Sequence, residues 1–140
     1  MEIKIKKIDK DMPLPEYGHK GDAGFDLKAS RDISLPPKEK IAVPTGLALE
    51  IPEGYVGLIW DKSGLAVKHG MKVMGGVIDS TYRGEILVGV INLSDEIYSF
   101  AKGDKVAQMI IQEYKEVIFK EEELSETERG EGGFGSTGKR

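Results

Sequence analysis

The chain has 140 residues, a formal net charge of −4 and no cysteine. This length suits one domain with a substantial hydrophobic core and is too short for two comfortable ones. The acidic balance argues against a broad nucleic-acid-binding surface, although it leaves room for a local basic pocket. The lack of cysteine excludes a disulfide framework, a thiolate metal site and a cysteine nucleophile.

The sequence contains neither a long apolar run nor a signal-like N-terminus. A membrane-spanning helix needs about 20 consecutive, mostly apolar residues. Residues 3–6 instead alternate between isoleucine and lysine, as a half-buried strand does. We therefore expect a soluble, unexported, cytoplasmic protein with no membrane partner.

Short runs of branched and aromatic residues recur along the chain, with turn residues between them roughly every eight to twelve positions. Only residues 64–69 resemble a helix, a short one, with Ser63 placed to cap it. This pattern predicts an all-β, jelly-roll-like barrel or sandwich. The expected strands are 3–8, 25–29, 32–35, 41–43, 47–51, 55–60, 73–78, 85–92, 98–100, 105–114 and 117–119.

The run from Val73 to Glu85 is the most informative part of the sequence. It predicts a strand ending at Ile78, a turn that begins at the carboxylate of Asp79, and a second strand. Gly75 and Gly76 lack Cβ atoms, so a flat ligand could approach the main chain closely and bond to its amide and carbonyl groups. The alternative interpretation is an ordinary hairpin with a polar tip.

The C-terminal part of the chain divides into a charged run, 121–128, and a glycine-rich basic run, 129–140. We expect a domain over 1–120, a solvated linker over 121–128 and a flexible arm over 129–140. A plain disordered tail is the competing interpretation. Phe134 is hard to explain in such a tail, whereas residues 135–138 supply the free amides and hydroxyls of a phosphate cradle.

Five segments together resemble the five motifs of the trimeric dUTP pyrophosphatases, or dUTPases. The segment 76–85, Gly-Val-Ile-Asp-Ser-Thr-Tyr-Arg-Gly-Glu, is similar to the third motif, and the others occur in the family's order over nearly the whole chain. The five segments are Asp22–Leu27, Lys62–Ala66, Gly76–Glu85, Gly103–Gln108 and Arg129–Gly138.

The resemblance implies hydrolysis of dUTP to dUMP and pyrophosphate, which removes dUTP and supplies dUMP for thymidylate synthesis. Asp79 would activate a water for in-line attack on the α-phosphorus. Tyr82 would pack on the deoxyribose and exclude a 2′-hydroxyl. Phe134 would stack on the uracil, which the backbone of Met74, Gly75, Gly76, Val77 and Ile78 would read.

The same resemblance implies phosphate contacts from Lys62, Ser63, Gly64, Gln108, Arg129, Gly135, Ser136 and Thr137, with Asp26 organising the site. Most family members have arginine where this chain has Lys62, and lysine lacks arginine's bidentate fork. Asp26 also has an alternative interpretation as a turn-capping residue beside a glycine. Ser63 has the competing interpretation of a helix cap, and Gln108 could simply face outward from its apolar strand.

The resemblance further implies a homotrimer whose active sites combine segments of three chains, and Mg²⁺ that arrives on the substrate phosphates without a protein cage. No His/Cys cluster suggests another metal, and we expect His69 to be structural.

Two alternative functions are a dCTP deaminase and a non-catalytic binding module. The dCTP deaminases share this fold, but their catalytic glutamate falls at about the position of Gly89. A non-catalytic jelly-roll module would be expected to lack the acid or the arm, and this chain has both.

Overall fold

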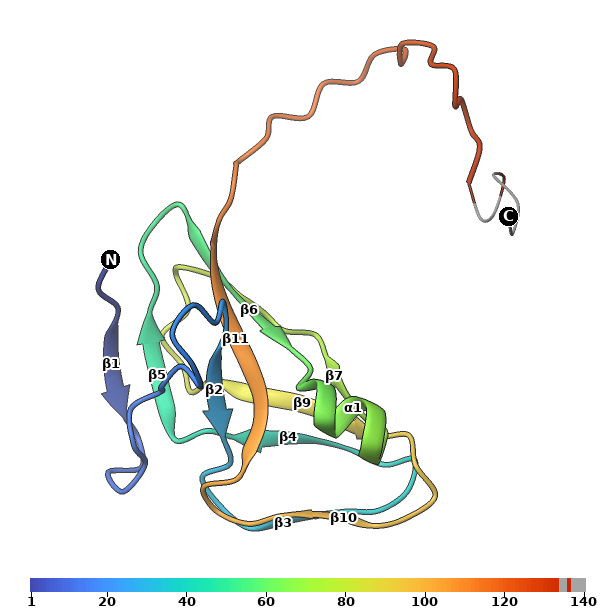
Figure 1. The fold of residues 1–140 in the computed structure, drawn as a ribbon. Coiled ribbons are helices and arrows are strands. Elements are labelled where there is room, and N and C mark those ends of the chain that lie inside the picture. The colour runs from blue at the N-terminus through green and yellow to red at the C-terminus, as the bar shows by residue number, and fades with distance from the viewer. Residues whose placement is uncertain (134–135, 137–140) are drawn as a thin grey trace.

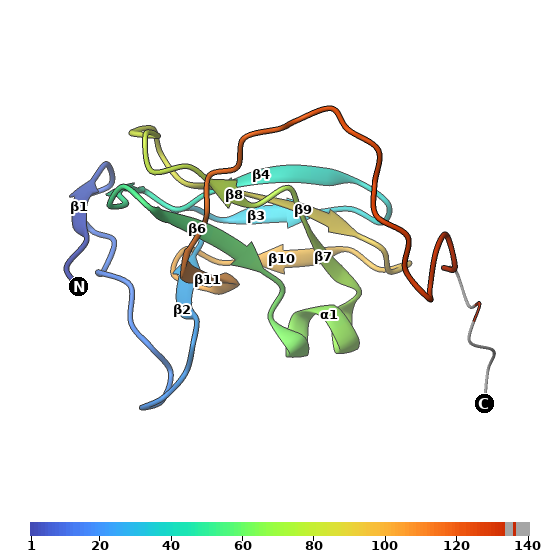
Figure 2. The ribbon, with the colours of Figure 1, turned by 90° about the horizontal axis from the view of Figure 1, so that it is seen from above.

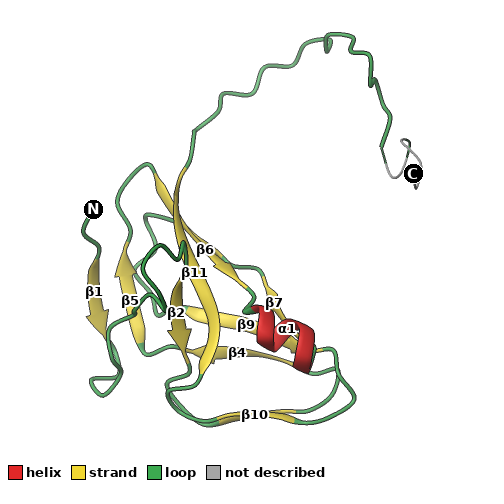
Figure 3. Cartoon of the chain, viewed as in Figure 1, coloured by secondary structure: helices red, strands yellow, loops and turns green. Residues whose placement is uncertain are grey.

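The computed structural model describes residues 1–133 and Ser136, which form a β-rich body, one helix and a long C-terminal segment (Figures 1 and 3). The elements in chain order are β1 (Lys4–Lys7), β2 (Phe25–Lys28), β3 (Ile33–Leu35), β4 (Lys40–Pro44), β5 (Leu47–Glu50), β6 (Tyr55–Trp60), α1 (Ser63–His69), β7 (Met71–Met74), β8 (Val77–Ile78), β9 (Leu87–Asn92), β10 (Tyr98–Phe100) and β11 (Lys105–Glu113).

The strands form four antiparallel sheets, with the orders β2-β11-β6-β8, β4-β9-β7, β1-β5 and β10-β3. Neighbours in a sheet are mostly distant in sequence, and in Figure 1 the strands of the four-stranded sheet run across β4 and β9. In the view of Figure 2, β6 crosses the body between β4 and α1. This arrangement confirms the predicted all-β, jelly-roll-like domain with one short helix.

The core lies between the sheets and follows the two-residue period of the strands. In β9 the buried positions are Val88, Val90 and Asn92, while the residues between them are less buried. Leu27 and Met109 from the four-stranded sheet belong to the same buried cluster as Val88 and Val90. Burial of each such aliphatic side chain stabilises the fold by about 1.5–3 kcal/mol, so this cluster supplies the rigid base for the loops above it.

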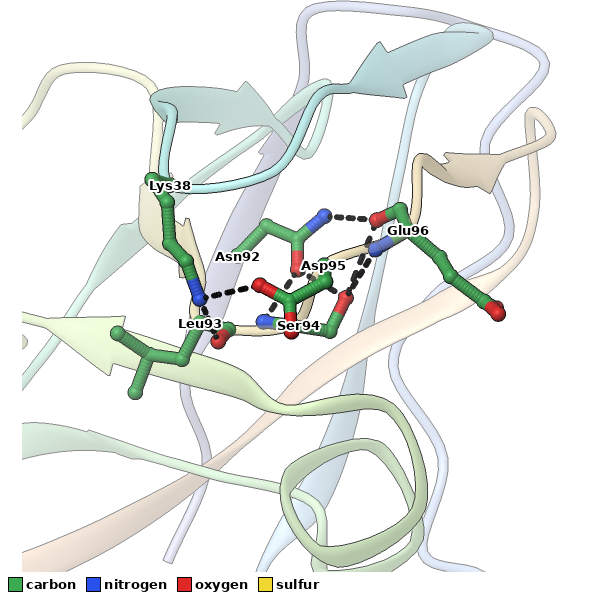
Figure 4. Close-up of polar contacts among 6 residues, drawn as sticks. All are labelled: Lys38, Asn92, Leu93, Ser94, Asp95 and Glu96. Atoms are coloured by element: carbon green, nitrogen blue, oxygen red, sulfur yellow. Dashed lines mark hydrogen bonds and ion pairs between the residues drawn. The ribbon is translucent and has the colours of Figure 1, made fainter.

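Asn92 is the one asparagine of the chain, and its side chain is fully buried. Its amide Nδ2 donates to the carbonyls of Leu35 (3.0 Å) and Glu96 (2.7 Å). Its Oδ1 accepts from the amide (2.9 Å) and the hydroxyl (2.7 Å) of Ser94 (Figure 4). Because each polar atom has a partner, this buried amide fixes the loop after β9.

Three local predictions are wrong. The run 73–78 is two strands: β7 pairs with β9, whereas β8 pairs with β6. Ser63 is the first residue of α1, and the N-cap is Lys62, which makes no side-chain cap hydrogen bond. No strand forms at 117–119, where Val117, Ile118 and Phe119 are exposed and have no hydrophobic surface to pack on.

After β11 the described part of the C-terminal segment leaves the body (Figure 1) and forms no helix or strand as far as residue 133. Within the described residues, no helix has the length and apolar character required to cross a membrane.

Candidate active site

The split between β7 and β8 opens a gap beside β9. Met74 still pairs with Gly89 of β9, but Val77 and Ile78 pair with β6. β8 is the last strand of its sheet, so the edge that does not pair with β6 is open. A cavity of about 170 Å³ lies there and is lined by Val77, Ile78, Asp79, Tyr82, Glu85 and Leu87. We call it the split-strand cavity; open main-chain groups at a strand edge can bond to a ligand as a further strand would.

Glycine is required at positions 75 and 76, just before β8, for different structural reasons. Gly75 has a φ of +72°, and a Cβ there would meet no atom within 4 Å, so its main chain is open to a ligand. Gly76 has a φ of +108°, but its Cβ would lie 2.8 Å from the Ile59 carbonyl oxygen. Glycine at position 76 is therefore needed for close packing on β6, and its contact with a ligand stays a prediction.

The turn that carries Asp79, residues 79–84, is fastened to the body. The Tyr82 amide donates to the Asp79 carbonyl (3.1 Å), and the Tyr82 hydroxyl donates to the Glu85 carbonyl (2.9 Å). The Glu85 carboxylate accepts from the Gly46 amide at 2.7 Å, and the buried Thr45 hydroxyl donates to the Ile86 carbonyl at 2.8 Å. The turn thus has a fixed base despite its exposed tip.

Asp79 itself is exposed at the start of this turn. It lines the split-strand cavity and also a larger, adjacent one of about 420 Å³ that includes Tyr55 and Tyr114. Within residues 1–133 and Ser136, its carboxylate makes no ion pair and no side-chain hydrogen bond that would hold it away from a ligand. A carboxylate free to accept a proton at the mouth of a cavity is suited to general-base work.

Tyr82 is another polar residue that lines the split-strand cavity, and 42% of it is exposed. The ring lies so close to Gly84 that a Cβ at residue 84 would collide with the phenol. Glycine at position 84 therefore permits the hydrogen bond that fixes the ring beside the split-strand cavity.

The predicted phosphate-contacting residues Lys62, Ser63 and Gly64 lie between β6 and the first turn of α1, where Ser63 and Gly64 are exposed. Gln108 of β11 joins them: its Nε2 donates to the Asp61 carbonyl at 2.9 Å. A Cβ at Gly24 would lie 2.7 Å from the Gln108 Oε1, so only glycine leaves room for this side chain.

Asp26, which is 8% exposed, lies beside this element. Its two carboxylate oxygens pair with the ammonium groups of Lys62 (2.5 Å) and Lys105 (2.6 Å). Burial alone would raise the pKa of Asp26, but hydrogen bonds and charge from the two lysines hold this pKa below its ordinary value. This geometry supports an organising role for Asp26 over a turn cap. We call these three residues the Asp26 cluster.

The structure brings the predicted residues together in two groups and not in one. Val77, Ile78, Asp79 and Tyr82 line the split-strand cavity, Gly75 and Gly76 come directly before β8, and Met74 lines a separate cavity with Gly89 and Val90. Lys62, Ser63, Gly64, Gln108 and Asp26 lie around α1 and the start of β11. In the described part of the chain, neither of the two cavities lined by Asp79 includes a residue of the second group.

Two of the predicted arm residues, Arg129 and Ser136, are described, and their hydrogen bonds stay within the arm. The Arg129 guanidinium donates to the Gly132 carbonyl at 2.7 Å, and the Ser136 amide donates to the Gly133 carbonyl at 3.0 Å. Phe134, Gly135 and Thr137 lie outside the described residues. A metal cage is also not formed within 1–133 and Ser136, where no group of three or more His, Cys, Asp or Glu side chains converges.

Three supporting residues were not singled out from the sequence: Asp61, Glu85 and Lys105. Asp61 accepts from the Val73 amide and pairs with Lys72, both at 2.6 Å, so it ties the loop before α1 to β7. The available signal for Asp61 was its place directly before Lys62, in the motif that departs from the family pattern. Glu85 and Lys105 lie within recognised motifs, but their partners come from 39 and 79 positions away, and one sequence cannot reveal such pairs.

Comparisons with known proteins agree along the whole chain. The dUTPase family model matches residues 10–138. A deoxyuridine 5′-triphosphate nucleotidohydrolase of Finegoldia magna is 48% identical, over 97% of this chain and 99% of the relative. One from Nautilia profundicola is also 48% identical, over 99% of this chain and all of the relative.

Solved structures show the same fold. The dUTPase of Staphylococcus bacteriophage 80alpha with dUpNHpp superposes with a TM-score of 0.87 at 32% identity, over 98% of each chain. A mutant dUTPase from phage phi11 of S. aureus, described with a structural Mg(II) ion, gives 0.82 at 27% identity, over 89% of this chain and 98% of the other. Together with the curated relatives, these matches show that the chain belongs to the dUTPase family of nucleotidohydrolases.

Proposed function

We propose that this protein hydrolyses dUTP to dUMP and pyrophosphate through attack of an Asp79-activated water on the α-phosphorus. The observation that carries the proposal is the split-strand cavity, where an open strand edge and a free carboxylate meet. Uracil would bond to the main chain from Met74 to Ile78. Asp79 would hold the water in line with the phosphorus and accept its proton. The product dUMP would be available for thymidylate synthesis.

Discrimination among nucleotides would follow from the walls of this cavity. Its volume of about 170 Å³ is below the roughly 300–1,000 Å³ typical of sites for whole drug-sized ligands, so it suits a base and sugar without the triphosphate. The Tyr82 ring, fixed by its bond to the Glu85 carbonyl, would exclude a 2′-hydroxyl. The phosphates would then extend to residues outside the cavity.

We further propose that those outside residues come from other copies of the chain. The base side and the phosphate side form separate groups within one chain, and the C-terminal segment leaves the body with Ile118 and Phe119 exposed (Figure 1). The outer face of the four-stranded sheet also leaves Trp60 and Val77 more than half exposed. A homotrimer with shared sites would cover such apolar surface and bring Lys62, Ser63, Gly64, Gln108, Arg129 and residues 134–137 to one substrate.

Mg²⁺ would enter this reaction on the triphosphate. The described residues offer no convergent set of carboxylates, so the chain's own donors fit a metal whose ligands are phosphate oxygens and water. When bound, Mg²⁺ would neutralise charge on those oxygens. The protein's part is then to position the nucleotide and the water.

Deamination of dCTP receives no support from the geometry. A side chain at Gly89 would begin 2.9 Å from the Met74 carbonyl oxygen, so a glutamate there would require β7 to move. A non-catalytic role is opposed by the free carboxylate of Asp79 at the cavity mouth.

The deciding experiment measures pyrophosphate release, with magnesium, from dUTP, dTTP, dCTP and UTP. We expect release from dUTP alone; no cleavage of dUTP, or equal cleavage of all four, would reject the proposal. Light scattering measures the mass of the assembly in solution, which should correspond to three chains. In a co-expressed mixture of Asp79→Asn and arm-deleted chains, shared sites predict restored turnover, and inactivity would contradict sharing.

A further inference from the structure

Lys105 is the least expected member of the Asp26 cluster. It begins β11, opposite Lys28 of β2, just before an irregularity in the register between Lys105 and Ala107. Its ammonium lies 2.6 Å from one Asp26 oxygen, while Lys62 lies 2.5 Å from the other. The two lysines thus approach one carboxylate from different strand ends.

The burial of the three groups is unequal. The Asp26 side chain is 9% exposed, that of Lys62 29% and that of Lys105 51%. A buried carboxylate without a cation is strongly destabilising. One lysine is enough to neutralise it, so the cluster carries one positive charge in excess, immediately before Ser63 and Gly64.

We infer that Lys105 is a positioning residue that keeps Asp26 neutralised while the Lys62 ammonium moves from Asp26 to a phosphate oxygen of the substrate. This inference rests on the proposed function, in which Lys62 contacts phosphate. It assigns to Lys105 an indirect role, without contact between Lys105 and the nucleotide.

Two features make the exchange feasible. Lysine is a compact charge on a flexible stem, so its ammonium can change partners while its backbone stays in place. The backbone here is held, because the carbonyl of the preceding residue, Asp61, accepts from Gln108 and its carboxylate bonds to the Val73 amide. Lys105 lies 2.6 Å from the other oxygen of Asp26, so after the exchange Asp26 would still have a cation beside it.

Without Lys105, Lys62 would be the single cation on Asp26. Binding phosphate would then require breaking a buried ion pair, and affinity would fall. Removing Asp26 as well would release Lys62 and restore the net charge of the cluster to its original +1. A direct phosphate contact by Lys105 predicts the opposite for that double variant, since the contact would still be missing.

The test uses the full-length enzyme and two readouts with magnesium, the Kd of dUpNHpp and the steady-state constants for dUTP. For Lys105→Met we expect both Kd and KM to rise about tenfold, because one partner of a desolvated charge pair has been removed, and kcat to change by less than about twofold. Lys105→Arg should retain tight binding. Lys4→Met, which removes an exposed ion pair with Glu50, is the matched control and should change nothing.

The double variant Asp26→Asn/Lys105→Met should bind dUpNHpp within about threefold of the wild type, since the pair that held Lys62 is gone. Asp26→Ser replaces Asp26→Asn if a thermal melt shows that the first pair does not fold. An unchanged Kd in Lys105→Met, or a Kd that stays high in the double variant, overturns the inference. A wild type that leaves dUTP intact would instead reject the proposed function.

Discussion

The turn 79–84 and the C-terminal segment over residues 114–133 are both largely exposed, yet they are held very differently. The turn is anchored to the body through Glu85 and Ile86, which bond to Gly46 and Thr45. In the described part of the segment, Tyr114 bonds to Gly54, and the later backbone bonds stay within residues 127–136. Ile118 and Phe119 are 99% and 92% exposed.

This difference distinguishes the part of the site that one chain forms by itself from the part that needs a further surface. The turn needs no further surface, because the split-strand cavity and Asp79 are already in place. The segment carries large apolar side chains in water, and their burial elsewhere would be favourable by about 25 cal/mol per Å². We therefore expect a change at Asp79 in the turn to affect turnover, and changes in the segment to affect substrate binding.

The largest expected effect comes from Asp79→Asn. The substitution removes the proposed base from a turn whose hydrogen bonds do not involve its carboxylate, so turnover should fall about 10²- to 10⁴-fold while the melting temperature stays unchanged. The measurement is kcat for dUTP together with the Kd of dUpNHpp, which should be retained. Asp95→Asn, a change at another exposed carboxylate, is the control. Near-normal turnover in Asp79→Asn would reject the base assignment.

Deletion of residues 129–140 should have the next largest effect. Loss of base stacking by Phe134 alone is worth roughly 1–3 kcal/mol, which corresponds to about 5- to 150-fold, and the phosphate contacts of Arg129, Ser136 and Thr137 would be lost too. Catalytic efficiency toward dUTP should fall by at least that factor. The free energy of unfolding should not change, because the described residues of this segment, 129–133 and Ser136, add nothing to the core cluster. Unaltered kinetics after deletion would remove the proposed role of the arm, and Phe134→Ala measures the stacking share.

Asn92→Ala should lower stability without lowering activity, which is the reverse of the result expected for deletion of the arm. It leaves the Leu35 and Glu96 carbonyls and the Ser94 amide without their buried partner. We expect the free energy of unfolding to fall by about 1–3 kcal/mol, with kcat unchanged in the folded enzyme. Urea unfolding at a fixed protein concentration gives the value. Ser94→Ala, which loses one hydroxyl contact with Asn92, should cost less, and equal losses would contradict the buried-amide explanation.

The sequence predicted the fold well where periodicity is local. The strand at 55–60 is confirmed, and the strand expected at 47–51 is observed over Leu47–Glu50. A half-buried strand should expose every second side chain, but Ala48 is buried between Leu47 and Leu49, so the expected alternation is wrong there. The run 73–78 was misread as one strand, since nothing local shows that β8 leaves β9 for β6. Likewise 117–119 has strand-forming residues but no partner strand in the described chain.

The candidate site likewise combines residues that local motifs indicate with contacts that one sequence does not show. Asp79 and Tyr82 were found because a turn motif carries them, and their shared cavity follows from short-range geometry. The motifs also pointed to Asp26 and Lys62, but their ion pair and the contribution of Lys105 arise from folding between distant strands. The predicted roles of Arg129, Ser136 and Thr137 depend on a second surface and stay predictions.

The smallest expected effect concerns the Asp26 cluster, which ion pairs hold within the body, and it is a change in the pH dependence of stability. Burial opposes the charged form of Asp26, but Lys105 and Lys62 outweigh it and lower the pKa of this carboxyl in the folded protein. Its contribution to stability is therefore complete above the unfolded pKa of about 3.9 and is lost as the pH falls through the lower folded value. Urea unfolding from pH 6 to 2 should show a shallower acid loss in Asp26→Asn than in the wild type. Parallel profiles would mean that the two lysines add no net stability, because their attraction then only offsets the cost of burying the carboxylate.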